Sequence, residues 1–140
     1  MREFLAVWRD AKSANLVLPA MPNEHDRSLE HLLWHVVNSS GRYMTSMCAH
    51  LRLPDPHLQP VPATGDVEGH AEAYLERLLA WWRIPLAGVS AADMEPELYT
   101  PGMHYWIDAM LEHAVVHPAR HSFQLRELMA AQDGERLDVR

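Results

Sequence analysis

The sequence predicts an all-α protein, a four-helix bundle, from its composition, its breaks and the spacing of its apolar residues. Hydrophobic residues make up 48% of the 140 residues, a proportion typical of a globular fold with a buried core. Between the glycine and proline breaks, Ala, Leu, Met, Glu and Arg dominate, and these residue types favour helix. The length fits one domain, so we expect a single domain over residues 1–140 and no sheet.

The first two predicted helices cover residues 2–18 and 28–51. The first ends before Pro19, because proline lacks the amide hydrogen that a helix interior requires. Ser28 begins the second, since its hydroxyl can cap a free amide in the first turn. The first helix is expected to bury a face made of Phe4, Val7, Trp8 and Ala11.

The third predicted helix covers residues 67–83 and follows a proline-rich connection at residues 53–66. Each proline in the connection removes a helix donor, so this segment is expected to be extended. Its length would let the chain cross the bundle instead of turning straight back. The expected buried stripe of the third helix is Val67, Ala71, Tyr74, Leu75, Leu78 and Trp82.

The fourth predicted helix starts with Thr100 as the N-cap and Pro101 as the first helical residue. It is expected to run to about Gln132, because Gly134 is a natural stop, and residues 135–140 are expected to fray. Its predicted buried residues are Trp106, Met110, Leu125 and Leu128.

The charge of the chain argues against two classes of partner. The formal net charge is −7, from 12 Lys and Arg against 19 Asp and Glu, which repels the phosphate backbone of nucleic acids. No run of Lys and Arg predicts binding to a membrane surface, and no apolar stretch approaches a membrane span. With no signal peptide at the start, we expect a cytoplasmic protein. Cys48 is the only cysteine, so an intrachain disulfide is excluded.

Histidine is unusually frequent, with 10 in the chain, and five of them fall at four-residue spacings. A helix turns about 100° per residue, which places His117 and His121 within the apolar stripe of the fourth helix and His113 at its edge. Imidazoles four residues apart can reach one metal ion. On the second helix, His35 flanks the buried stripe, and His31 lies further toward solvent. One divalent metal ion shared by His35, His117 and His121 would explain all three positions.

Other interpretations of these histidines stay open on the residues alone. His117 and His121 could be core residues whose nitrogens bond to backbone or water. His35 could be a surface residue. Pro118 lies inside the predicted helix and costs about 3 kcal/mol there, so the helix kinks or breaks beside His117. The kink either has only a structural role or orients His117 and His121 toward a shared site.

Two segments resemble a known family. Residues 28–36, SLEHLLWHV, are similar to the second helix of the DinB-like family (the DinB/YfiT superfamily), and residues 117–125, HPARHSFQL, are similar to its last-helix motif HxxxHxxQL. The resemblance implies an up-down-down-up four-helix bundle, often dimeric. It also implies a divalent metal, commonly zinc or nickel, held by His35, His117 and His121. The usual HRGQ is HSFQ here, so Ser122 and Phe123 depart from the pattern.

Three histidine ligands would leave the ion with an open position, as in a catalytic site. Some members of the family are thiol-dependent transferases, so the resemblance implies a small-molecule substrate and a low-molecular-weight thiol as cosubstrate. Arg42, Arg83 or Arg120 could meet a carboxylate on that thiol, or each could be a solvated surface charge.

Two alternatives to the thiol transferase remain. A metal-dependent hydrolase would need a carboxylate base, and neither Glu112 nor Asp108 points toward the core on the helical wheel. The second alternative is a non-enzymatic, metal-stabilised helical dimer that acts in a stress response. Five tryptophans and a wide apolar face predict a homodimer in any of these cases.

Overall fold

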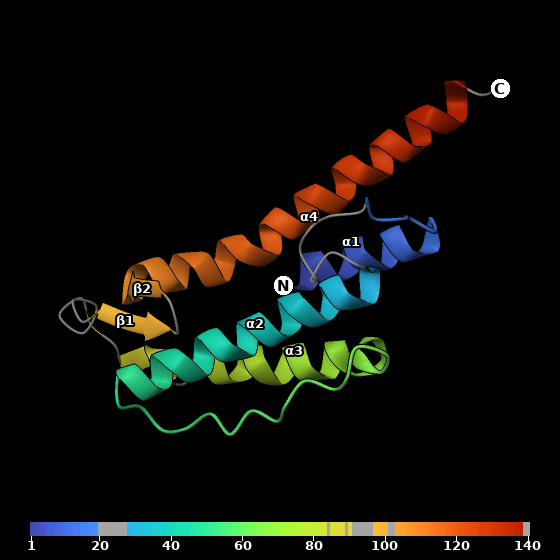
Figure 1. Ribbon diagram of the computed structural model, residues 1–140. Helices are drawn as coiled ribbons and strands as arrows, with labels where there is room; N and C mark the ends of the chain where they lie inside the picture. Colours follow the sequence, from blue (N-terminus) through green and yellow to red (C-terminus); the bar gives the residue numbers. More distant parts are fainter. Residues whose placement is uncertain (20–27, 84, 89, 91–96, 101–102, 139–140) are drawn as a thin grey trace.

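The computed structural model describes residues 1–19, 28–83, 85–88, 90, 97–100 and 103–138 (Figure 1). Its helices are α1 (Arg2–Ser13), α2 (Leu29–His50), α3 (Val67–Arg83) and α4 (Ile107–Asp138). A 3₁₀ helix, η2 (Pro85–Gly88), and two short strands, β1 (Glu97–Thr100) and β2 (Met103–Trp106), lie between α3 and α4. The predicted all-α, four-helix architecture is confirmed, but the expectation of no sheet is wrong, because β1 and β2 form a two-stranded antiparallel sheet. None of the described helices is long and apolar enough to cross a membrane.

The predicted limits of α2 and α3 are confirmed, because local signals mark them clearly. The Ser28 hydroxyl accepts a hydrogen bond from the His31 amide at 3.2 Å, as expected of an N-cap. Five of the six residues in the predicted α3 stripe are buried, and Trp82 is partly buried.

The first helix is shorter than predicted. It ends at Ser13 rather than at residue 18, and Ala14 and Asn15 close it by donating backbone hydrogen bonds to Asp10 and Lys12. Asn15 has a left-handed φ of 52°, a conformation that asparagine tolerates and that ends a helix. Leu16 is nevertheless buried, so the apolar pattern that extended the prediction reflects packing after the helix end.

The start and the end of α4 also differ from the prediction. Strands β1 and β2 pair antiparallel with Thr100 opposite Met103, and α4 begins at Ile107, so the Thr100–Pro101 signal does not begin the helix. Gly134 does not stop it, and α4 continues to Asp138. Met110 and Leu125 are fully buried as predicted, Leu128 is partly buried, and the side chain of Trp106 lies outside the described residues.

Pro118 lies within α4 without breaking it. Figure 1 shows that α4 bends partway along its length. A proline inside a helix lacks an amide hydrogen and crowds the carbonyl four residues earlier, here that of Ala114, and these are the usual causes of such a bend.

Side-chain contacts define the relative directions of α1, α3 and α4. Ion pairs join α1 and α3 in reverse order along the chain, from Arg2–Glu76 through Arg9–Glu72 to Lys12–Glu68. Contacts between α1 and α4 follow the same order in both helices, from Glu3–Arg126 to Ala14–Gln132. Helix α1 is therefore antiparallel to α3 and parallel to α4, and the long connection after α2 carries the chain back before α3 begins (Figure 1).

The core joins all four helices. Trp8 is fully buried, and its indole N–H donates a hydrogen bond to the Leu29 carbonyl at 2.6 Å, which fixes α1 against the start of α2. Around it pack fully buried residues that include Phe4, Leu32, Val36, Leu75 and Leu125. This packing holds α2 and α4 side by side, and the histidines lie along that seam.

Candidate metal centre

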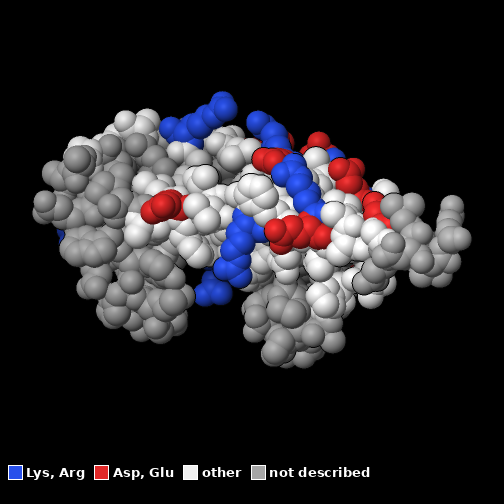
Figure 2. All heavy atoms as spheres, turned by 90° about the horizontal axis from the view of Figure 1, so that it is seen from above, with Lys and Arg blue, Asp and Glu red and all other residues white. Residues whose placement is uncertain are grey.

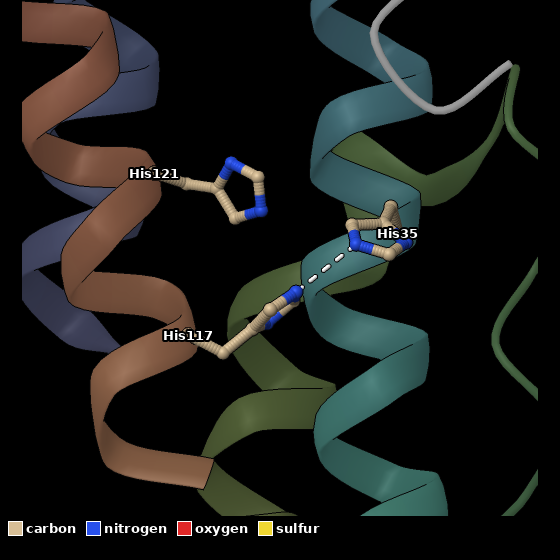
Figure 3. A group of neighbouring side chains, drawn as sticks. All are labelled: His35, His117 and His121. Carbon is tan, nitrogen blue, oxygen red and sulfur yellow. Dashed lines mark hydrogen bonds between the residues drawn. The ribbon is translucent and has the colours of Figure 1, made fainter. Parts of the chain in front are cut away.

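The structure brings together the three histidines that the sequence predicted. Helix α2 supplies His35, and α4 supplies His117 and His121 (Figure 3). One ring nitrogen from each lies within 4.8 Å of the other two, and the Nε2 atoms of His35 and His117 are 3.0 Å apart. The three side chains could hold one metal ion.

Helical spacing places the pair on α4. His117 and His121 are separated by one turn, and their ring centroids lie 4.8 Å apart. They are 8% and 6% exposed, on the face that also buries Met110 and Leu125. His35 is partly buried and faces both rings from α2, with centroid distances of 4.9 and 5.6 Å.

The surroundings keep His117 uncharged. Burial lowers the pKa of His117 from 6.5 to about 3, and its neighbours His121, His35, His113 and Arg120 contribute to that decrease. Neutral imidazole, with a lone pair available, is the form in which histidine binds a metal ion.

One polar atom of the site is buried without a partner among the described residues, namely Nδ1 of His117. The contact between His117 and His35 can contain only one ring hydrogen, on one Nε2 or the other. Whichever ring donates, His117 Nδ1 is left as a buried donor without an acceptor or a buried acceptor without a donor. Such an atom costs about 1–3 kcal/mol in the folded protein, so packing alone does not explain a histidine at this position.

Gln124 orients the third histidine. Its side-chain oxygen accepts a hydrogen bond from His121 Nδ1 at 2.9 Å, which fixes the tautomer so that Nε2 carries the lone pair a metal ion would bind. Figure 3 shows the His121 ring directed toward the gap between His35 and His117. Gln124 was not among the predicted site residues, although its position three residues after His121 was the available signal.

The donor set consists of three imidazole nitrogens, which are ligands for divalent transition metal ions. Zinc–nitrogen bonds are about 2.0–2.1 Å, so ligand nitrogens around a tetrahedral zinc lie about 3.3 Å apart. The 3.0 Å separation of His35 and His117 is close to this value, and the full set is somewhat more open. Among the described residues, the group contains no carboxylate and no thiolate.

Two further histidines lie outside the group, as predicted. The His31 ring contacts the Ser28 hydroxyl at 3.1 Å and belongs to the N-terminus of α2. The His113 ring lies one turn before His117, at 5.6 Å between centroids, and packs edge-on against Tyr43 at 5.3 Å.

Of the residues that the structure describes, the other candidates do not belong to the histidine group. Arg83 is exposed at the end of α3, and Arg120 is exposed beside His121. Glu112 is exposed, whereas the side chain of Asp108 lies outside the described residues. Cys48 is buried, and burial raises the pKa of its thiol, so it is an inert core residue.

The chain was also compared with known proteins. No family model matches it, and neither a curated protein nor a solved structure matches it. The metal centre is therefore inferred from the positions and chemistry of its own side chains.

Proposed function

We propose that the protein binds one divalent metal ion, zinc or nickel, through His35, His117 and His121, and that it is a DinB-like metalloprotein. The observation that carries this proposal is the convergence of three imidazoles from two helices, two of them buried, with one nitrogen of each within 4.8 Å of the others. Separate structural roles would require separate hydrogen-bond partners, and His117 Nδ1 has none among the described residues.

We further propose that the site belongs to a metal-dependent enzyme acting on a small molecule, with a low-molecular-weight thiol as cosubstrate. When bound, an ion on three neutral ligands keeps its full charge and an open position, and it favours the thiolate over the thiol. The chain's own residues support this chemistry by holding the ligands still. Helix α4 fixes the spacing of His117 and His121, and Gln124 fixes the ring orientation of His121.

The hydrolase alternative has less support at this site. Activation of water usually requires a general base beside the ion, and no carboxylate belongs to the histidine group among the described residues. Glu112, the nearest acidic residue on the described part of α4, is exposed.

Metal analysis of purified protein tests the proposal most directly. Protein prepared without affinity-resin metal and reconstituted with zinc or nickel is expected to retain one ion per chain. His35→Ala, His117→Ala and His121→Ala should each lose it, because two ligands hold an ion weakly. The matched controls His31→Ala and His113→Ala should retain it. Retention by His121→Ala together with loss by His113→Ala would move the site one turn along α4, and no retention by the wild type would reject it.

A thiol panel with a generic electrophile tests the enzymatic part. The metal-loaded wild type is expected to accelerate alkylation of at least one low-molecular-weight thiol, and the reconstituted His117→Ala variant is not. Equal rates in both proteins would leave a metal site without transferase activity and would favour the non-enzymatic alternative.

We also propose a homodimer that uses the outer face of α4. Val116 and Phe123 lie on that face seven residues apart and are 49% and 63% exposed. Sedimentation equilibrium is expected to give twice the 16.0 kDa chain mass at micromolar concentration. Phe123→Asp should shift it to one chain mass, and a wild type that is already monomeric would contradict the proposal.

A further inference from the structure

A second polar site lies away from the histidines, where α2 meets the proline-rich connection. It is a pocket of about 270 Å³, smaller than the pockets that usually hold drug-sized ligands. Residues 58–61 of the connection form one wall, and Tyr74 of α3 reaches it from the core. Helix α2 lines it with Asn38, Gly41, Arg42, Thr45 and Ser46.

Tyr74 brings its hydroxyl to the wall of this pocket. Its side chain belongs to the core and is 4% exposed, yet the hydroxyl makes no hydrogen bond with any described residue. At the pocket wall the hydroxyl is placed to donate to a bound ligand. Burial also raises the pKa of Tyr74, so the group stays protonated and can donate.

Gly41 makes room for that hydroxyl. A β-carbon at this position would overlap the Tyr74 oxygen, so any larger residue would displace the ring. The absence of a side chain on α2 therefore gives the hydroxyl its place at the pocket wall.

The electrostatics of the lining favour an anion. Arg42 contributes a guanidinium that forms no ion pair with a described residue. No Asp or Glu lines the pocket, although the chain contains 19 of them and has a net charge of −7. Asn38, Arg42 and Ser46 are four residues apart in turn, which places their hydrogen-bonding groups along one face of α2.

We propose that this pocket binds the oxyanion group, a carboxylate or a phosphate, of a small molecule. The Tyr74 hydroxyl donates to one oxygen, the Arg42 guanidinium pairs with the negative charge, and Asn38 and Ser46 contact neighbouring polar atoms. The pocket is separate from the metal centre, since Arg42 follows His35 by seven residues, or about 10 Å along α2.

Isothermal titration of the chelator-treated full chain tests the proposal, with malonate and inorganic phosphate as separate ligands. Binding of one or both at millimolar concentration is expected. Arg42→Gln should weaken it by about tenfold or more, and Tyr74→Phe by about fivefold, because each removes one donor to the anion. Arg83→Gln, a matched arginine outside the pocket, should bind like the wild type. Malonate binding alone would indicate a carboxylate ligand, and phosphate binding alone a phosphorylated one.

Two control variants distinguish anion binding here from binding at the metal centre and from a purely structural role of Tyr74. His121→Ala should retain anion binding, so loss of the metal centre and loss of this site are distinguishable. Tyr74→Phe should keep the wild-type melting temperature without ligand, because its hydroxyl has no structural partner among the described residues. Binding that Arg42→Gln and Tyr74→Phe leave unchanged would mean an adventitious ion only. No binding in the wild type, or a lowered melting temperature of Tyr74→Phe, would also overturn the proposal.

Discussion

Where α1 lies against α3, charged side chains meet in water, whereas histidine rings meet in the interior where α2 lies against α4. The α1–α3 seam contains the ion pairs Arg2–Glu76, Arg9–Glu72 and Lys12–Glu68, and each of their side chains is at least 41% exposed. Figure 2 shows Lys and Arg beside Asp and Glu on the visible face, rather than in separate patches of one charge. Such pairs contribute little to stability, because water and salt screen them.

The α2–α4 seam places polar rings where apolar side chains would pack better. His117 and His121 are almost fully buried, and His117 Nδ1 has no partner among the described residues. The α1–α3 seam, which is exposed, could lose its charged side chains with little loss in the free energy of unfolding. The buried seam carries a cost in the folded protein that packing alone does not explain, which indicates function.

The largest expected effect is stabilisation of the buried seam by an ion. With free zinc at about 100 times its dissociation constant, the free energy of unfolding should rise by about 2.7 kcal/mol, because only the folded chain gathers the ligands. Thermal unfolding with chelator and with zinc measures this rise. His117→Ala should show none, whereas Arg9→Ala, on the exposed seam, should show all of it. A rise in both variants would mean that zinc acts elsewhere.

Acid should destabilise the metal-free protein through His117. Its pKa is about 3 when folded and near 6.5 when unfolded, so the unfolded chain takes up the proton first. This contribution to stability is present in full above pH 6.5 and is lost as the pH falls toward 3. At about pH 5 the loss should be about 2 kcal/mol. Urea unfolding at neutral pH and at about pH 5 checks this, and an equal loss in His117→Leu would assign the effect to other groups.

Replacing the imidazole of His117 by an apolar side chain should stabilise the metal-free protein at neutral pH. His117→Leu removes the unpartnered nitrogen, so the free energy of unfolding should rise by about 1 kcal/mol while metal binding disappears. Urea unfolding in the presence of chelator measures the change. A decrease instead would show that the imidazole already has a stabilising partner without an ion.

The smallest effect is expected at the exposed seam. A double-mutant cycle on Arg9 and Glu72 should give a coupling energy of about 0.5 kcal/mol, which should vanish at about 1 M salt. A coupling energy well above about 1 kcal/mol would remove the contrast between the two seams.

The parts of the fold that were predicted correctly carry local signals. Ser28 caps α2, and residues 67–83 follow one apolar period from end to end. The errors fall where packing or strand pairing overrides a local signal. Leu16 is buried without being helical, and the β1–β2 pairing overrides the start signal at Thr100.

In the candidate site too, the residues that local periodicity predicts differ from those that depend on how the helices pack. Periodicity alone placed His117 and His121 on the buried face of their helix, since both ligands share one element. His35 was ambiguous on its own helix, because the angle at which α2 meets α4 decides whether it reaches the other two. The contact of Tyr74 with Gly41 could not be predicted from the sequence, because it depends on how α2 and α3 pack together.

The separation of the ligands along the chain gives the proposed ion a topological role. His35 and His117 are 82 residues apart, so one ion bound to both would close a loop spanning more than half of the chain. Closing a loop of that length in a disordered chain costs about 4.5 kcal/mol of entropy, as for a disulfide of the same span. A chain with a single cysteine would thus gain a reversible crosslink, and a chelator would act on it as a reductant acts on a disulfide-bonded protein.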